Sequence, residues 1–381
     1  MSLLIEKHIK NFRLCLHSLP ARAQGEDANK LAIVYFVLHG LGLLDQIHVS
    51  PDTKLHIDYI YSHLINTKDT NIQAFRSSQT FKLQDEHNDY DLPNLSATLF
   101  ALSSLLILKD DYSQRLDRHK IMAFVARCQV KSGPLKGSFV PVLDVNGEPW
   151  GESDLRLCYI AASIRKMVGY DRLPESERVS DIDVDTMTHF ILDKFNFNGG
   201  IASTSFTESH SGLTFCGLAA LKLTGFDLDT KNDFVALTQN WLVHRQVDYP
   251  VELYGEEPDY EYYEERDIGG FNGRENKFAD TCYSWWVMSL LEMLGEGGLK
   301  LIDGERALTY LLEGTQHKLM GGFGKDTESM PDPFHSFLGL ASVSLLKASG
   351  LEFDGMETLQ EIDTELVITK KLREFMDAMW Q

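Results

Sequence analysis

The chain has 381 residues, of which 43% are hydrophobic, and a formal net charge of −20. This apolar content is sufficient for a large buried core. The negative charge argues against nucleic acid or an anionic lipid surface as a partner, although an ordinary acidic protein would have the same composition. No apolar run is long enough to span a membrane, so no transmembrane segment is expected.

The cysteines, at positions 15, 128, 158, 216 and 282, are odd in number and irregularly spaced. Residues 1–20 carry charged side chains throughout their apolar positions, unlike a secretory leader. We therefore expect a cytoplasmic protein whose cysteines are reduced thiols.

Apolar segments of helical length alternate with short glycine turns along the chain. They cover residues 31–44, 95–108, 155–168, 212–223, 282–294 and 334–346. Each is almost entirely apolar, as in helices that are buried on most sides. Period-two alternation bounded by hairpin turns is almost absent. The sequence therefore predicts an all-α fold.

A glycine motif repeats ahead of these segments. Gly199-Gly200-Ile201, Gly269-Gly270-Phe271 and Gly321-Gly322-Phe323 are the clear copies, and Gly137-Ser138-Phe139 is a degenerate one. Repeats of this kind cannot bury their apolar faces alone, so they stack into a solenoid or a closed ring.

The repeat also aligns polar candidates. His210 and Asp280 each stand ten residues after the second glycine of their motif, and Tyr283 and His335 stand thirteen after it. If the repeats superpose, these residues share equivalent loop-to-helix positions. In a closed ring they would converge on one centre.

Two further segments stand out by charge. Residues 254–267 are rich in acids and tyrosines. This composition indicates a solvated inserted loop, or alternatively a docking site for basic substrates. Residues 352–381 are charged and amphipathic, which predicts a closing helix.

Asp280, Cys282 and His335 form a candidate zinc set. Asp280 and Cys282 are two residues apart, so both can reach one ion only at the start of a helix. Asp, Cys and His donors with an open fourth position are typical of catalytic zinc. The chain lacks a His-Glu-x-x-His helix, which disfavours a hydrolase. Because zinc deprotonates thiols, a substrate cysteine in the open position would become a thiolate nucleophile. The alternative is that Cys282 is buried and inert.

Cationic and hydrogen-bonding residues surround the candidate metal ligands. Arg274 and Lys277 precede them, Tyr283 follows Cys282, His210 lies in the previous repeat, and Lys325 lies in the next. Guanidinium and ammonium groups suit phosphate oxygens. Solvated surface charges would explain the two cations equally well. Beside a thiolate-binding metal, however, they suggest a diphosphate leaving group.

Aromatic residues fall at predicted helix starts in different repeats: Tyr159, Phe215, Trp285, Trp286, Phe334 and Phe337. Ordinary core packing explains any one of them. A ring of repeats with aromatic inner walls would nevertheless hold a long isoprenoid tail.

Four stretches resemble the β subunits of protein prenyltransferases. They are residues 154–159 (Asp-Leu-Arg-Leu-Cys-Tyr), 208–217 (Glu-Ser-His-Ser-Gly-Leu-Thr-Phe-Cys-Gly), 269–286 and 321–340. Their order and spacing agree over about residues 28–350. The resemblance implies an α/α toroid, that is, an α6–α6 barrel formed by residues 1–381 as a single domain. Residues 352–381 would then be its closing helix.

The resemblance also implies roles for individual residues. Zinc would be bound by Asp280, Cys282 and His335. The diphosphate would be bound by His210, Arg274, Lys277 and Tyr283, and the lipid and peptide would be bordered by Arg156, Tyr159 and Trp286. The family further implies an obligate heterodimer with a helical-repeat α subunit, which contributes another lysine.

Within the family, several positions favour the type I geranylgeranyl-transferring members. Ala32, in the segment 31–36 that ends at Phe36, replaces a bulky tryptophan of the farnesyl-transferring members and leaves room for a longer lipid. Leu338 replaces a second large aromatic residue, although type I members have phenylalanine there. Phe75-Arg76-Ser77-Ser78 is similar to the type I insert Phe-Arg-Gly-Ser-Ser. Ala32, Phe36 and Leu338 are therefore expected at the lipid pocket.

Lys325 bears on the metal requirement. By the same resemblance, the farnesyl-transferring members have an aspartate here that helps to hold magnesium. A lysine cannot bind magnesium, but its ammonium group can neutralise the same diphosphate oxygens. We therefore expect turnover that requires zinc but not magnesium.

The implied function is transfer of geranylgeranyl from its diphosphate to the cysteine of a C-terminal C-a-a-X sequence, with X mostly Leu. Rho-type small GTPases would be acceptors, and the acidic chain would attract acceptors with upstream lysines. Three alternatives remain: a farnesyltransferase subunit, a Rab-type subunit, and a non-catalytic toroidal scaffold with structural zinc.

Overall fold

The computed structural model describes residues 1–19, 21–48, 51–67, 71–82, 90–228, 232–250 and 263–380. Most of the acidic segment 254–267, predicted as an inserted loop or docking site, lies outside these residues. Its described end includes the short 3₁₀ helix η7 (Glu265–Asp267).

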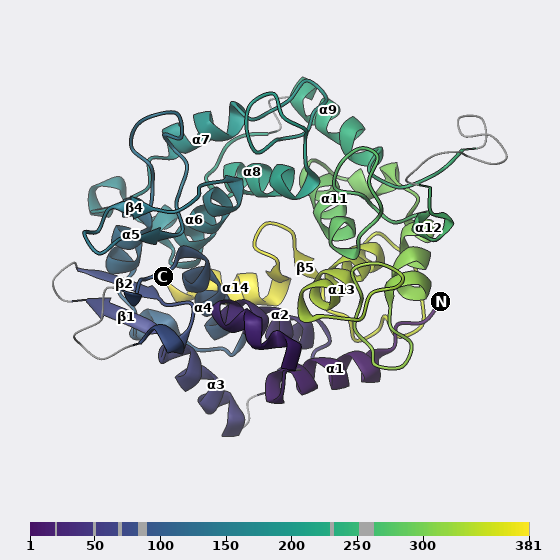
Figure 1. Ribbon diagram of the computed structural model, residues 1–381, viewed down its shortest axis with the longest axis horizontal. Coiled ribbons are helices and arrows are strands. Elements are labelled where there is room, and N and C mark those ends of the chain that lie inside the picture. The colour runs from purple at the N-terminus through teal and green to yellow at the C-terminus, as the bar shows by residue number, and fades with distance from the viewer. Residues whose placement is uncertain are drawn as a thin grey trace.

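A ring of inner helices forms the centre of the molecule. Within the described residues it consists of α2 (Lys30–Leu43), α4 (Leu95–Ile107), α6 (Leu155–Met167), α8 (Ser211–Leu223), α11 (Thr281–Met293) and α13 (Pro333–Ala348). Each packs against the next in chain order, and α13 packs back against α2, so the ring closes (Figure 1). Every inner helix coincides with a predicted apolar segment, which confirms the prediction of an all-α closed ring.

A second layer of helices surrounds this ring (Figure 1). In the described chain it contains α1 (Ile5–His17), α3 (Pro51–Tyr61), α5 (Arg118–Arg127), α7 (Val184–Leu192), α9 (Asn232–Val243) and α12 (Gly304–Thr309), which continues as the π-helical η9 (Tyr310–Thr315). These helices bury one face only; in α1, for example, His8, Ile9 and Phe12 face inward. Their amphipathic character follows from covering the ring on one side and meeting solvent on the other.

The repeated glycines lie where an outer helix turns into the loop before an inner helix. Gly199, Gly269 and Gly321 have φ of +98°, +88° and +70°, a conformation that favours glycine. A Cβ atom on Gly199 would also lie 2.2 Å from the carbonyl oxygen of Leu237 on the next outer helix. The motif therefore repeats because each turn presses its backbone against the following repeat.

Short antiparallel pairs join β1 (Leu64–Thr67) to β2 (Ile72–Phe75), β3 (Val142–Leu143) to β4 (Pro149–Trp150), and β5 (Ile362–Asp363) to β6 (Ile368–Thr369). β2 is buried on both faces, so its sequence lacks alternation. Other short 3₁₀ helices within the described residues are η1 (Ala21–Asn29), η2 (Gln79–Phe81), η4 (Tyr112–Gln114), η5 (Tyr170–Arg172), η6 (Glu175–Glu177) and η8 (Gly298–Leu301).

The predicted closing helix over 352–381 is wrong in its first part. Only α14 (Lys370–Met379) is helical, and the β5–β6 hairpin precedes it. The hairpin turn is tied to the inner ring, because the hydroxyl groups of Tyr35 on α2 and Tyr159 on α6 donate to the carbonyl oxygens of Val367 and Glu365, at 2.9 and 3.0 Å. In Figure 1 the segment crosses the middle of the ring. It therefore closes one end of the barrel.

Candidate functional site

Three predicted metal ligands meet at the starts of two neighbouring inner helices. The donor atoms of Asp280, Cys282 and His335 all lie within 4.8 Å of one another. Asp280 is the N-cap residue of α11, where its Oδ1 accepts the backbone N–H of Cys282 at 2.8 Å. His335 is the third residue of α13. The cap places the Asp280 carboxylate beside the Cys282 thiol, which a regular helix would not do.

His335 is oriented by a carboxylate that the sequence analysis did not select. Its Nδ1 lies 2.6 Å from Asp332 Oδ2, and its Nε2 lies 3.3 Å from Asp280 Oδ1. Asp332 is the N-cap residue of α13. A carboxylate on the far ring nitrogen is the usual partner of a metal-binding histidine. Asp332 stands ten residues after Gly322, so the repeat spacing that selected His210 and Asp280 also points to it.

The protonation of these residues fits a cation site. Burial, and then the Asp280 carboxylate, raise the pKa of the Cys282 thiol well above its ordinary value. Burial opposes the charge on His335, but the hydrogen bonds that its ring donates to Asp280 and Asp332 raise its pKa to about 9. A divalent cation would replace the protons that the site otherwise holds. One sulfur, one nitrogen and one carboxylate oxygen make a donor set that suits zinc with an open position.

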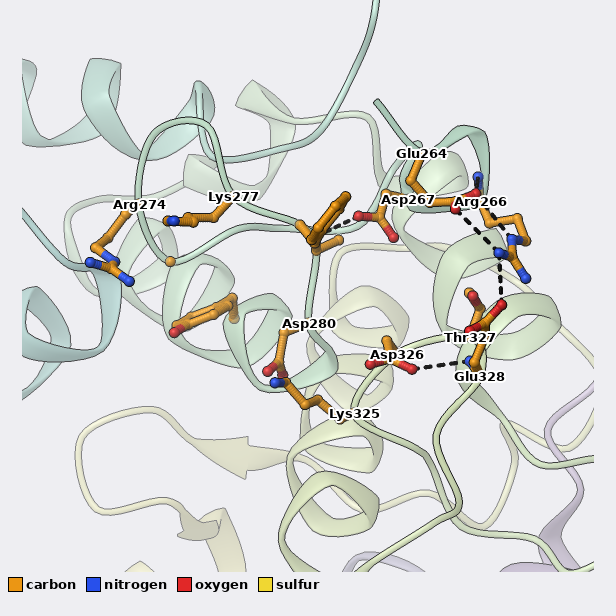
Figure 2. Close-up of a pocket in the computed structure, with 14 residues that line it drawn as sticks. Glu264, Arg266, Asp267, Arg274, Lys277, Asp280, Lys325, Asp326, Thr327 and Glu328 are labelled. Carbon is orange, nitrogen blue, oxygen red and sulfur yellow. Dashed lines mark hydrogen bonds and ion pairs between the residues drawn. The ribbon is translucent and has the colours of Figure 1, made fainter. Parts of the chain in front are cut away.

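A cleft of about 410 Å³ opens beside this group. Its lining includes Asp280 together with Arg274, Lys277, Tyr283 and Lys325, all predicted to bind a diphosphate. Figure 2 shows Arg274 and Lys277 on one flank, Asp280 and Lys325 in the middle, and Arg266 on the other flank. Arg266 pairs there with Glu264 and Glu328, at 3.0 and 2.9 Å. The cleft is therefore cationic on one side and charge-paired on the other.

His210 and Tyr283 form a pair of neutral hydrogen-bond donors. His210 is the N-cap residue of α8, and its Nδ1 accepts the backbone N–H groups of Gly212 and Leu213 at 3.1 and 3.4 Å. The proton of the neutral ring therefore resides on Nε2, which lies 3.2 Å from the Tyr283 hydroxyl oxygen. Burial, with Arg274 and Arg156 nearby, lowers the pKa of His210 to about 4.

Tyr283 keeps its proton for a related reason. Burial, with Cys282 and Asp280 close by, raises the pKa of Tyr283 to about 12. Its ring packs against Gly273, where a Cβ atom would lie 2.2 Å from Tyr283 Cζ. Glycine at position 273 therefore lets the loop that carries the cations lie directly on the phenol.

The cations of the cleft are held by contacts across repeats. The Arg274 guanidinium pairs with Glu208 at 3.1 Å. The backbone carbonyl of Lys325 accepts the N–H of Thr281 at 2.8 Å, which fixes this loop against the start of α11. Glu208 was not predicted as a site residue, although it stands two positions before His210. Its role depends on packing between repeats, which one repeat does not show.

Most of the predicted lipid-contacting residues lie on the inner helices. Phe36 on α2 contacts Phe334 at the start of α13, with ring centroids 5.2 Å apart. Phe215 contacts Tyr159 and Trp286, with centroids 5.4 and 4.8 Å away.

The three other predicted substrate contacts differ in exposure. Ala32 on α2 is half-buried. Leu338 on α13 is only 1% exposed, so it lies within the packing of the ring. Arg156, the second residue of α6, is exposed and pairs with Asp154, with Nε 2.8 Å from the carboxylate.

Comparison with known proteins agrees with this architecture. Residues 3–368 match the model of the prenyltransferase alpha-alpha toroid domain. The chain belongs to this family. Within the described residues, no helix combines the length and apolarity needed to cross a bilayer.

Several prenyltransferase toroid proteins are similar to the chain over most of its length. The geranylgeranyl transferase type-1 subunit beta of Arabidopsis thaliana is 29% identical, covering 91% of this chain and 86% of that protein. The corresponding subunit of Dictyostelium discoideum is 28% identical, covering 96% and 95%. A solved structure of Candida albicans protein geranylgeranyltransferase-I complexed with GGPP is 46% identical, with a TM-score of 0.90 and 100% of both chains covered.

Proposed function

We propose that this chain is the catalytic β subunit of a protein geranylgeranyltransferase type I. It transfers the geranylgeranyl group from geranylgeranyl diphosphate to the cysteine of a C-terminal C-a-a-X sequence, with X mostly Leu. The observation that carries the proposal is the cleft itself. The metal group Asp280, Cys282 and His335 adjoins a cationic wall, inside a toroid that is 46% identical to a type I enzyme bound to GGPP.

The reaction forms a bond between the acceptor sulfur and C1 of the lipid, and it breaks the bond between C1 and a diphosphate oxygen. The bonding electrons leave with the diphosphate. When bound, zinc would hold the acceptor cysteine as a thiolate at neutral pH. Asp332 prepares this site by fixing the ring of His335, at 2.6 Å.

The leaving group gains negative charge, and residues in the cleft, together with His210 beside Tyr283, supply donors for it. His210 Nε2–H and the Tyr283 O–H are neutral donors that backbone contacts and burial hold in place. The cleft-lining cations Arg274, Lys277 and Lys325 add positive charge. Donors that are fixed before the substrate arrives stabilise the transition state without reorganising. We assign these five residues to the departing diphosphate.

The lipid would lie inside the ring, against Phe36, Tyr159 and Trp286. These side chains come from three different inner helices and are each half-buried. The β5–β6 hairpin, tied to Tyr35 and Tyr159, closes the far end. We expect Ala32 to leave room for a C20 chain, Leu338 to shape its end from within the wall, and Arg156 to meet the acceptor peptide.

The proposal includes an α subunit and two statements about metals. The relatives named above are beta subunits, and we propose a heterodimer with a helical-repeat partner that adds one lysine to the cleft. Zinc is the proposed metal, and Lys325 makes magnesium unnecessary. Rho-type small GTPases are the proposed acceptors, and residues 1–381 the proposed single domain.

Replacing Cys282 tests the catalytic assignment. In the heterodimer, Cys282→Ala should release the bound zinc and lower the transfer rate more than about 100-fold, because it removes a ligand rather than a supporting contact. Metal analysis and a transfer assay measure the two effects. Cys128→Ala, which removes another buried thiol, at the end of α5 and outside the lining of the cleft, should retain both zinc and activity. If Cys282→Ala retains both as well, the assignment is wrong.

A further inference from the structure

The loop that carries Arg274 and Lys277 also carries an acid. Glu275 lies between them, in the segment 272–277, which we call the cation loop. Beneath this loop lies Arg245, just after α9, with its side chain 5% exposed. Its Nη2 lies 3.6 Å from Glu275 Oε1, while its buried Nε and Nη1 atoms make no hydrogen bond within the described chain.

Several contacts tie the cation loop to the end of α9. Glu275 Oε1 accepts the Trp241 Nε1–H at 2.7 Å. The carbonyl oxygen of Arg245 accepts the backbone N–H of Asn272 at 2.9 Å. The Asn272 side chain then donates to the carbonyl oxygen of Lys277 at 3.1 Å, which closes the loop on itself. The position of the two cations therefore depends on groups outside the cleft.

Among the described residues, two carboxylates lie close to the cations of this loop. Arg274 already pairs with Glu208 at 3.1 Å, and Glu275 sits beside it in sequence. Both carboxylates weaken the attraction of the loop for an anion in the cleft. Burial lowers the pKa of Arg245, and the carboxylates of Glu275 and Glu208 oppose this effect. A buried arginine stays protonated, so it supplies a positive charge beside Glu275.

We propose that Arg245 is a positioning residue for diphosphate binding. By offsetting the negative charge of Glu275, it lowers the repulsion between that carboxylate and a diphosphate held by Arg274 and Lys277, and through the same contact it anchors the loop. Arg245 does not line the cleft, so it acts through Glu275 rather than by touching the substrate. This inference rests on the proposed function, because it requires a diphosphate in the cleft.

A set of charge-matched variants of the heterodimer tests this inference. Arg245→Met leaves Glu275 unpaired, and we expect it to raise both the KM for geranylgeranyl diphosphate and the inhibition constant of inorganic pyrophosphate about tenfold. Glu275→Gln keeps an acceptor for Trp241 and removes the acid, so both constants should stay at or below those of the parent. The double variant Arg245→Met/Glu275→Gln restores the charge balance and should return both constants to within about threefold.

Two controls separate charge from folding. Arg165 is also 5% exposed and is held by Asp181 at 2.7 and 2.8 Å, away from the cleft. Arg165→Met should lower thermal stability without changing either constant. Arg245→Lys keeps the charge, so it should bind diphosphate within about threefold of the parent even if Arg245→Met does not fold.

Three results would overturn the inference. One is a double variant as impaired as Arg245→Met, because a purely structural role is not rescued by removing the acid. Another is an equal rise in KM for Arg165→Met. The third is a tenfold rise for Arg245→Lys. Failure of the proposed function would give a different result. The unsubstituted heterodimer would then neither transfer the lipid nor be inhibited by pyrophosphate, and the role of Arg245 would be contradicted too.

Discussion

At the scale of single residues, three residues of the site occupy the same position, the N-cap of an inner helix. His210, Asp280 and Asp332 are the N-cap residues of α8, α11 and α13. Each side chain accepts a backbone N–H and also contacts a functional partner. His210 and Asp332 use their second polar atom for it, toward Tyr283 and His335, whereas Asp280 uses the same Oδ1 for the Cys282 N–H and for His335. Helix N-termini also favour anions, so these helix starts suit a diphosphate.

Lys325 is the residue on which the magnesium prediction rests. Its side chain lines the cleft, while its backbone carbonyl accepts the N–H of Thr281. We expect the parent heterodimer to be indifferent to magnesium. Lys325→Asp, which places a magnesium ligand beside the diphosphate and keeps the backbone contact, should turn over several-fold faster when magnesium is added.

Transfer rates measured against magnesium concentration test this expectation. Lys300→Asp in η8 makes the same change of charge away from the cleft and should remain indifferent. A Lys325→Asp heterodimer whose rate does not respond to magnesium would contradict the assigned role of Lys325.

The sequence predicted which residues lie together in the candidate site better than it predicted the residues that hold them in place. Repeat spacing aligned His210 with Asp280, and the structure places both at N-caps. Asp332 obeys the same spacing and could have been found. Glu208 and Arg245 could not, because their roles arise from contacts between repeats that lie far apart in the sequence.

At the scale of elements, burial on most sides made the inner helices predictable. An almost wholly apolar segment of this length has few alternatives to a buried helix. The error at 352–381 has the opposite origin. α14 is amphipathic, with Leu372 and Met376 buried, whereas the charged residues before it form a hairpin whose strands are too short to show their own pattern. The hairpin is held by Tyr35 and Tyr159, which no local pattern reveals.

The contact of α1 with the last repeat predicts a dependence on pH. His8 accepts the Gly322 N–H at Nδ1 and lies 2.8 Å from Gln316 Oε1 through Nε2. Burial lowers the pKa of His8 from 6.5 to about 4, against the raising effect of Gln316. The unfolded chain therefore binds a proton first. The stability from neutral His8 is complete above about pH 6.5 and is lost as pH falls toward 4, by up to about 1.4 kcal/mol per pH unit.

Urea unfolding of the chain between pH 7.5 and pH 4.5 measures this dependence. His8→Gln should unfold more easily at pH 7.5 but lose less of its free energy of unfolding as pH falls. His17→Gln, at the exposed end of the same helix, should keep the slope of the parent. An unchanged slope in His8→Gln would contradict the account of α1.

At the scale of the whole molecule, closure of the ring joins the site to the fold. α11 and α13 bring the metal ligands together, and α13 packs on α2, so the last repeat is held by the first. The function therefore belongs to the ring rather than to any one repeat. The net charge of −20 is likewise a property of the whole chain rather than of the cleft.

This charge should speed encounters with basic acceptors. For peptides with lysines upstream of the C-a-a-X sequence, kcat/KM should fall with added salt more steeply than for otherwise identical neutral peptides, because salt screens long-range attraction. Steady-state rates over a range of salt concentrations give the two slopes. Equal slopes would show that the acidic surface does not steer acceptors.

The most direct test of the account is the choice of lipid and acceptor. The chain should be co-expressed with candidate α subunits and assayed with geranylgeranyl and farnesyl diphosphate against peptides ending in Leu and in Ser. We predict the highest kcat/KM for geranylgeranyl diphosphate with the Leu peptide. Preference for farnesyl diphosphate with the Ser peptide, or no transfer of either lipid, would contradict the proposed function.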